Sequence, residues 1–388
     1  MQKVIIKNLG AIKECEIELS PFTIFIGESG VGKSIILRTV SLLKWIYKKM
    51  QYKALLKASK INSDALRFRL DGLLKNSMLD DFFTKDSYIE LLVDGVSVVV
   101  IENAKLTPKY NNIKKKTFLV GKIVFLNDIR SSLPEILSSP SGKRAKFSYY
   151  TNDMIENFNA SFSNAKHHDL FTMDISLTSK KRVGYEQFYI KNKDSEIKFE
   201  NSSSGEKNIT ILELICGHFA SKYDFADGFS KGLLGLITER VELKNLEQLQ
   251  NFMKKNDFNN FLDIFIEEPE VNLYPMAQKK LVYFLSSLRK MTNTPSVVFS
   301  THSPYILTAL NNLLYASLLQ KRGISEDKIY KIVDEKFILN IDEFNAYLVA
   351  DGGVKSIIDS ETNLIRADEI DKVSSIIMDD FDALLELR

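Results

Sequence analysis

A short glycine-rich segment combines residue types that can hold phosphate groups. Residues 27–34 read Gly-Glu-Ser-Gly-Val-Gly-Lys-Ser; they follow the apolar run 22–26 and precede the amphipathic stretch 35–45. Glycines let backbone N–H groups turn toward an anion, and the N-terminus of the following helix favours negative charge. A strand, such a loop and a helix in this order form a phosphate-binding P-loop. The segment therefore predicts a nucleotide site rather than a chance glycine-rich turn.

Individual residues of this loop have different expected roles. Lys33 is expected to contact the β- and γ-phosphates, and the hydroxyl of Ser34 is expected to bind Mg²⁺. Both residues directly precede the amphipathic stretch 35–45. We therefore expect ATP and Mg²⁺ as ligands, and the residues expected to surround the nucleotide are Gly27, Glu28, Ser29, Gly30, Val31, Gly32, Lys33, Ser34 and Ile35.

Paired carboxylates end a second apolar segment. Residues 261–266 read Phe-Leu-Asp-Ile-Phe-Ile and lead directly into Glu267 and Glu268. A buried strand that ends in two carboxylates, downstream of a P-loop, is the Walker B arrangement. Glu267 is expected to bind Mg²⁺, and Glu268 is expected to polarise the water that attacks the γ-phosphate. The simpler alternative is a strand end with solvated acids.

Two more segments carry polar groups that could reach a phosphate. The apolar run 296–300 leads into Thr301 and His302. Because ligands of α/β folds bind at the carboxyl ends of strands, His302 fits a sensor of the γ-phosphate. Residues 201–207 read Asn-Ser-Ser-Ser-Gly-Glu-Lys and precede a helical stretch. Such a segment is typical of a capped helix start that can bind an anion.

Hydrophobic periodicity predicts the elements that must position these motifs. Residues 1–26 alternate and predict short strands that end at the P-loop. Other segments that read as strands are 88–101 (with a turn at Gly95), 121–126 and 170–200, and those that read as helices are 35–85, 149–165 and 229–258. We predict a single ATPase domain over 1–388, with a helical and β insertion at 35–117, a helical insertion at 221–260 and an acidic helical segment at 340–388.

Composition restricts the class of protein. With 45% hydrophobic and 26% charged residues, the chain can bury a large core. No apolar run reaches the ~18 residues of a membrane span, and the N-terminus lacks the pattern of a signal peptide. Two cysteines, Cys15 and Cys216, form no disulfide framework and suit a reducing compartment. We therefore expect a cytoplasmic protein without a membrane partner.

The order of these motifs resembles that of ABC-type ATPases of the SMC, RecF and OLD class. It is more similar still to stand-alone ATPases of bacterial anti-phage defence systems such as PARIS, Septu and retron-associated modules. Residues 6–12 look like the N-terminal strand of these proteins, 267–275 like their extended Walker B and D-loop, and 301–304 like their H-loop. The resemblance makes Ser203 the signature serine and Gly205 the retained signature glycine.

This resemblance implies an architecture and a mode of action. The implied fold is α/β, an ABC-type P-loop ATPase with a mixed central sheet, flanking helices, a β-rich lobe and helical insertions. Two chains would close head to head, so that Ser203 and Gly205 of one face the P-loop of the other. Hydrolysis, with Glu268 as base and His302 as sensor, would reopen the dimer. We therefore expect a homodimer or higher oligomer that controls a separate effector protein, a toxin or a nuclease.

Three alternatives follow from other features of the sequence. The segment 103–127 has six lysines and no acid, which fits a DNA-binding ATPase of the SMC or RecF type that contacts nucleic acid through residues such as Lys115. The second alternative is a scaffold that binds nucleotide with little turnover. The third, an attached nuclease of the Toprim type, is disfavoured because Ala350 stands where that domain needs a glutamate and residues 370–384 have helical spacing.

Overall fold

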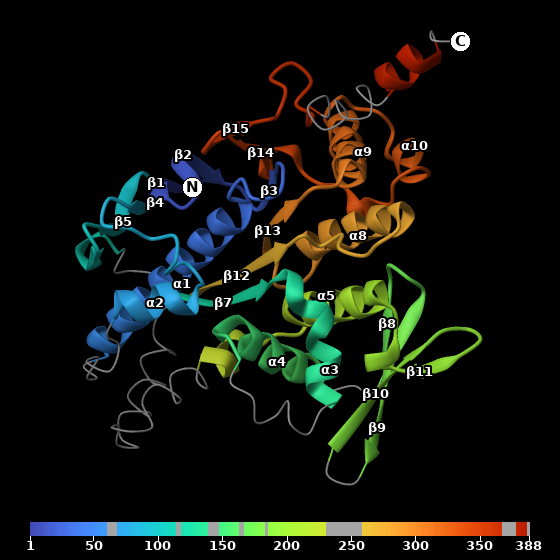
Figure 1. The fold of residues 1–388 in the computed structure, drawn as a ribbon, viewed down its shortest axis with the longest axis horizontal. Helices are drawn as coiled ribbons and strands as arrows, with labels where there is room; N and C mark the ends of the chain where they lie inside the picture. The colour runs from blue at the N-terminus through green and yellow to red at the C-terminus, as the bar shows by residue number, and fades with distance from the viewer. Residues whose placement is uncertain are drawn as a thin grey trace.

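A six-stranded sheet lies at the centre of the computed structural model (Figure 1). The residues that the structure describes are 1–59, 68–113, 118–138, 147–162, 167–182, 185–229, 258–366 and 378–385. Across the sheet the strands are β15 (Gly353–Ser356), β14 (Phe344–Ala350), β3 (Phe22–Ile26), β13 (Ser296–Thr301), β12 (Phe258–Glu267) and β7 (Phe118–Leu126). Neighbouring strands are parallel except β14 and β15. The mixed central sheet expected from the sequence is confirmed.

Side chains of the central strands alternate between two hydrophobic cores. In β3, Ile24 belongs to one core and Phe25 to the other. Strand β12 repeats the pattern, with Ile264 in the first core and Phe265 in the second. Since both faces of the sheet are covered, these strands read in the sequence as continuous apolar runs instead of polar and apolar residues in alternation.

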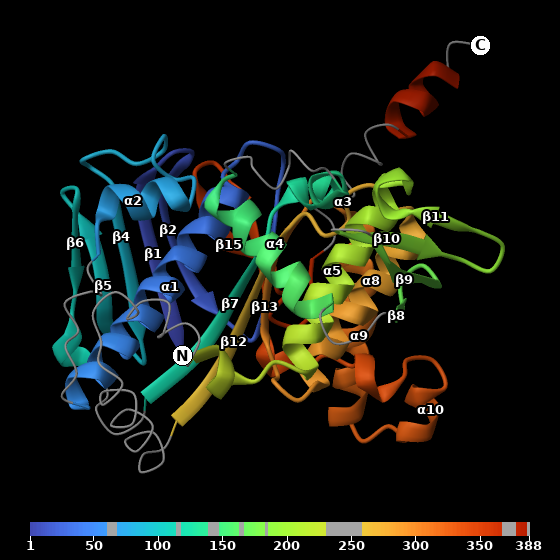
Figure 2. The same ribbon diagram turned by 90° about the horizontal axis from the view of Figure 1, so that it is seen from below.

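One face of the sheet is covered by α1 (Lys33–Ala58), which begins at the P-loop. Beyond α1 lies an antiparallel sheet of β2 (Ile12–Leu19), β1 (Gln2–Leu9), β4 (Tyr88–Val93), β5 (Val96–Glu102) and β6 (Lys105–Pro108). Helix α1 contacts strands of both sheets and lies between them (Figure 2). The turn between β4 and β5 is formed by Asp94 and Gly95, both with positive φ, as the expected hairpin requires. These strands form the β-rich lobe.

The opposite face carries helices and a smaller antiparallel sheet. That sheet consists of β8 (His167–Leu170), β9 (Ile175–Arg182), β10 (Tyr185–Lys191) and β11 (Glu196–Lys198). The main helices here are α4 (Tyr149–Phe162), α5 (Ser204–Ser221), α8 (Pro275–Ser287) and α9 (Pro304–Lys321). Shorter helices elsewhere are α2 (Leu70–Asn76), α3 (Leu133–Ser138) and α10 (Glu326–Tyr330). Helices α5 and α8 and the carboxyl end of β12 belong to the same core.

The expectation of a helical segment over 340–388 is wrong for its first part. Residues 344–350 form β14, which pairs with β3 and is therefore an inner strand of the central sheet. Phe344 and Ala346 face one core while Val349 faces the other, a period of two that fits a strand. Further along, residues 378–385 are helical and exposed, and this helix extends away from the body (Figure 1).

Parts of the predicted insertions cannot be compared with the structure. Residues 230–257, which contain most of the predicted helical insertion 221–260, lie outside the described residues, and so does Lys115. The insertion 35–117 combines α1, α2 and β4 to β6 over the ranges that are described. Within the described part of the chain, no helix has both the length and the apolar character that crossing a bilayer demands.

Candidate active site

The predicted site residues meet at one edge of the central sheet. Because β3, β12 and β13 are parallel, their carboxyl ends lie together. Strand β3 leads into the P-loop, β12 ends at Glu267, and β13 ends at Thr301, the residue before His302. In the register, Thr301 pairs with Ile26 and Glu267 with Ser300. Segments far apart in the sequence are thus brought to one place, where open α/β sheets bind ligands.

The P-loop has the backbone geometry of a phosphate cradle. Gly32 precedes α1 with φ of 108°, in the left-handed region that favours glycine. Gly27 must also be glycine, because a Cβ there would lie 2.4 Å from the carbonyl oxygen of Val349. The buried Lys33 Nζ donates to the carbonyl oxygens of Gly27 at 2.9 Å and Glu28 at 2.6 Å, so it lies across the loop. These residues fit a triphosphate, whose charge Lys33 and the helix N-terminus would balance.

Lys33, His302 and Glu268 form a continuous chain of contacts. Lys33 Nζ is 3.4 Å from His302 Nδ1, and His302 Nε2 is 2.8 Å from Glu268 Oε1. Since a lysine can only donate, His302 Nδ1 accepts and His302 Nε2 carries the hydrogen that it donates to Glu268. The charge of Glu268 also supports the protonated form of Lys33, against the lowering of its pKa by burial. The three residues expected to be catalytic are therefore neighbours.

Ser34 and Glu267 lie together and offer oxygen ligands of the kind Mg²⁺ prefers. The Ser34 hydroxyl hydrogen-bonds to the Glu267 carboxylate, whose side chain is only 2% exposed. Burial raises the pKa of Glu267, and Arg38 and the Ser34 hydrogen bond oppose the rise. Arg38 donates to both carboxylate oxygens, from Nε at 2.9 Å and from Nη2 at 3.2 Å. The pair of Ser34 and Glu267 fits a magnesium ion, with Arg38 holding the carboxylate in place.

Glu270 anchors the histidine, a role that the sequence did not reveal. Its Oε1 accepts from the backbone N–H of His302 at 2.7 Å and from Thr301 Oγ1 at 2.6 Å. Burial raises the pKa of this carboxyl group, and these two donors counteract the rise. Beyond it, Ser303 caps α9 through the N–H of Ile306 and donates to Gln278 Oε1 at 2.5 Å. The segment after β13 is therefore fixed on both sides of His302.

One family model matches part of the chain. Residues 230–307 match the model of a family described as AAA ATPase domain, a stretch that contains β12, β13 and His302. Over these residues the chain is similar to that family. No curated protein matches the chain.

Solved structures that align with this chain include heads of SMC proteins and an ABC ATPase. One is an SMC head bound to the C-winged helix domain of ScpA, 12% identical, with a TM-score of 0.40, covering 92% of this chain and 96% of that one. Another is the SMC head of Thermotoga maritima, 10% identical, with a TM-score of 0.35 and coverage of 92% and 97%. A dimeric ATP-binding cassette bound to ADP and phosphate is 11% identical, with a TM-score of 0.33 and coverage of 91% and 96%.

The predicted signature residues lie at the start of α5, outside the P-loop of their own chain. Ser203 is the N-cap: its hydroxyl accepts from the N–H of Glu206 at 3.2 Å, and the Glu206 carboxylate accepts from the N–H of Ser203 at 2.8 Å. Ser203 is exposed, whereas Gly205 is buried against the loop after β12. A Cβ on Gly205 would lie 2.7 Å from the carbonyl oxygen of Asn272. The capped helix start expected from the sequence is present.

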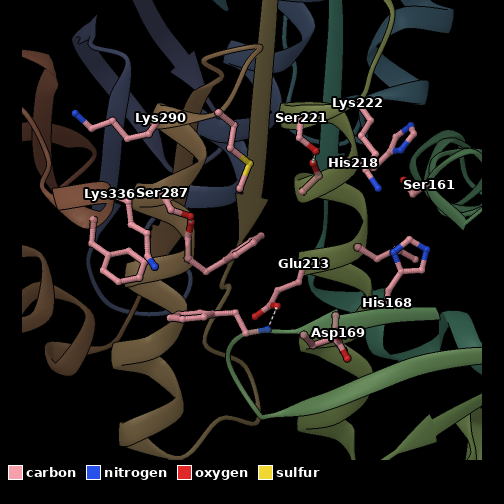
Figure 3. Close-up of a pocket in the computed structure, with 17 residues that line it drawn as sticks. Ser161, His168, Asp169, Glu213, His218, Ser221, Lys222, Ser287, Lys290 and Lys336 are labelled. Carbon is pink, nitrogen blue, oxygen red and sulfur yellow. Dashed lines mark hydrogen bonds between the residues drawn. The ribbon is translucent and has the colours of Figure 1, made fainter. Parts of the chain in front are cut away.

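A cavity of about 480 Å³ lies farther along α5, and none of the predicted site residues lines it. Glu213 of α5 lines this cavity (Figure 3). The Glu213 carboxylate accepts from the backbone N–H groups of Phe171 at 2.6 Å and Thr172 at 2.8 Å, in the turn between β8 and β9. Burial raises the pKa of Glu213. This carboxylate therefore fastens the smaller sheet to α5.

Proposed function

We propose that this protein is an ATP-binding and ATP-hydrolysing switch of the ABC type. The observation that carries the proposal is the chain of contacts from Lys33 of the P-loop through His302 to Glu268. Hydrolysis needs three kinds of group: a lysine to balance phosphate charge, a histidine that can sense the γ-phosphate, and a carboxylate that can activate water. Glu268 is partly exposed, with 36% of its side chain accessible, so water can reach it.

In this proposal the residues of the site divide the work of hydrolysis. Lys33 and the backbone N–H groups of the P-loop orient the triphosphate, and Glu268 accepts a proton from the attacking water. His302 donates to Glu268 and holds that carboxylate in the position of a base. Ser34 and Glu267 would hold Mg²⁺, which when bound neutralises phosphate charge and so favours attack.

We further propose that two chains close head to head around the nucleotide. Ser203 is exposed at the N-terminus of α5 and is not joined to the P-loop of its own chain by any of its hydrogen bonds among the described residues. A helix N-terminus suits a phosphate, so Ser203 fits the γ-phosphate held by a second copy. Closing on ATP and opening after hydrolysis would make the protein a timer in the cytoplasm, whose output belongs to a separate effector.

The proposed effector is a toxin or a nuclease of a bacterial anti-phage defence system. This part rests on the resemblance of residues 6–12, 203–207, 267–275 and 301–304 to stand-alone ATPases of such systems. The test has two arms. Steady-state phosphate release and light scattering with ATP test the switch, with Glu268→Gln expected to bind ATP, hydrolyse it slowly and remain dimeric. Plaque assays of cells expressing the native operon, with wild-type protein or Lys33→Ala, test the defence role, and equal plaque counts would contradict it.

A further inference from the structure

Arg130 is a fully buried cation whose hydrogen bonds all go to oxygen atoms of the protein near the site. It lies in the short 3-10 helix Asp128–Ser132 that follows β7, and its side chain is 0% exposed. Its Nη1 donates to the carbonyl oxygens of Asn127 at 2.8 Å and Glu267 at 2.6 Å. Its Nη2 donates to the carbonyl oxygen of Glu268 at 2.5 Å. The guanidinium thus binds the carbonyl groups of the two peptide bonds on either side of Glu268.

Asn208 extends this contact to α5. Its Oδ1 accepts from Arg130 Nε, and its Nδ2 donates to the carbonyl oxygens of Pro269 at 3.0 Å and Val271 at 2.7 Å. Asn208 is 1% exposed and lies one turn from the start of α5. Nearby, Gly205 lies against Asn272 so closely that no larger residue fits. The first turns of α5 and the loop 267–272 are therefore joined by Arg130 and Asn208.

The loop needs such support because its backbone is in a disfavoured conformation. Glu268 has φ of 43° and Asn272 has φ of 62°, the left-handed region that residues with a Cβ rarely adopt. Glu268 donates its N–H to the carbonyl oxygen of Ser300 at 3.0 Å, and its carbonyl faces Arg130. This backbone conformation directs the Glu268 carboxylate toward His302 Nε2. If Arg130 did not donate to the carbonyl oxygens of Glu267 and Glu268, Glu268 would favour an extended backbone conformation.

We propose that Arg130 and Asn208 are positioning residues that hold Glu268 in its active geometry and couple it to the N-terminal turn of α5. This inference rests on the proposed function, because Ser203 at the end of that turn is expected to contact the nucleotide of a second copy. A shift of α5 on closure moves Asn208, then Arg130 and the Glu268 backbone.

Two variants separate this role from a general loss of structure. Arg130→Lys keeps the charge but cannot make the fork of hydrogen bonds, because a lysine has a single nitrogen. Asn208→Asp keeps the acceptor for Arg130 and replaces the donor that faces Pro269 and Val271 with an oxygen. The matched control is Arg289→Lys, since Arg289 also donates to two carbonyl oxygens, of Thr294 and Pro295, far from the site.

The first measurement is steady-state ATP hydrolysis with ATP affinity by calorimetry. For both variants we expect kcat to fall at least tenfold while KM and ATP affinity change less than twofold, and we expect the control to match wild type. A fall in ATP affinity as large as the fall in kcat would overturn the proposal, since it would indicate a damaged P-loop. So would an unchanged kcat. If Arg130→Lys does not fold, Asn208→Asp alone decides between these results.

The second measurement is hydrogen exchange of the nucleotide-free protein, which does not depend on hydrolysis. The amide of Glu268 and its neighbours up to residue 273 should exchange at least tenfold faster in both variants, with α8 and α9 unchanged. Equal exchange in variants and wild type would overturn the positioning role. A wild-type protein that hydrolyses no ATP would instead contradict the proposed function, while the exchange result would still test the contacts of Arg130 and Asn208.

Discussion

Arg38 holds both carboxylate oxygens of Glu267, a residue 229 positions away in the sequence. Arg38 lies one turn after Ser34 on α1, and Glu267 is the last residue of β12. The pair therefore joins the P-loop helix to the Walker B strand at the place where Ser34 and Glu267 would bind Mg²⁺. Because a guanidinium and a metal ion use the same carboxylate oxygens, Arg38 stabilises the metal-free site and must share Glu267 when the metal binds.

Replacing Arg38 should make stability depend on magnesium. In Arg38→Met a buried carboxylate loses its cation, which should destabilise the metal-free protein by about 3 kcal/mol. Thermal melts in EDTA and in excess Mg²⁺ check this, and magnesium should restore part of the lost stability in the variant. The control is Arg366→Met, whose pair with Asp359 is partly exposed and should matter by less than about 1 kcal/mol. An Arg38→Met protein as stable as wild type in EDTA would show that the pair contributes nothing.

Magnesium binding should weaken as the pH is lowered, and at a higher pH than for an ordinary glutamate. Burial raises the pKa of Glu267, and Arg38 lowers it. Since only the ionised carboxylate binds Mg²⁺, affinity is present above the raised pKa and is lost as the pH falls through it. Removal of Arg38 takes away the opposing influence, so the loss should occur at a higher pH in Arg38→Met. Titrations with Mg²⁺ across a pH series check this, with Glu267→Gln expected to show no such dependence.

Some of the site could be predicted because its motifs are local. The P-loop, Glu268 and His302 each follow an apolar strand, and parallel strands place their carboxyl ends together. The contacts of Arg38 and Arg130 could not be predicted, because each joins segments more than a hundred residues apart. Strand β14 could not be predicted for a related reason, because its neighbour is β3, near the other end of the chain.

Lys33→Ala should abolish nucleotide binding. Lys33 Nζ lies across the P-loop on the carbonyl oxygens of Gly27 and Glu28, where it would meet the β- and γ-phosphates. Loss of that charge should weaken ATP binding by about a hundredfold or more, roughly 2.8 kcal/mol. Calorimetry with ATP measures the affinity, and the exposed Lys191→Ala serves as control. Wild-type affinity in Lys33→Ala would contradict the assignment of the P-loop.

Glu268→Gln should separate binding from hydrolysis. The amide keeps the shape of the side chain but cannot accept a proton from water, so hydrolysis should fall roughly 10²–10⁴-fold. ATP affinity should remain, because Lys33 and the P-loop backbone are untouched. Phosphate release and calorimetry measure the two quantities, and Glu361→Gln, in an exposed turn, is the control. If turnover is unchanged while Glu267→Gln abolishes it, the base has been assigned to the wrong carboxylate.

Ser203 should act on the nucleotide of a second chain. It caps α5 and is exposed, and its hydrogen bonds join it to Glu206. Ser203→Asp keeps an acceptor for the cap but places a negative charge where the γ-phosphate of the other chain is expected, so this variant alone should be inactive.

Mixing Ser203→Asp with Lys33→Ala tests the head-to-head arrangement directly. In a mixed dimer, the P-loop of the Ser203→Asp chain faces the signature segment of the Lys33→Ala chain, so one composite site is intact. Hydrolysis should therefore return in the mixture, although each variant alone has none. Ser203→Asn, which keeps the cap without the charge, should retain more activity than Ser203→Asp. Mixed dimers that form but do not hydrolyse ATP would leave residues 202–207 as a helix cap only, and would favour a nucleotide-binding scaffold.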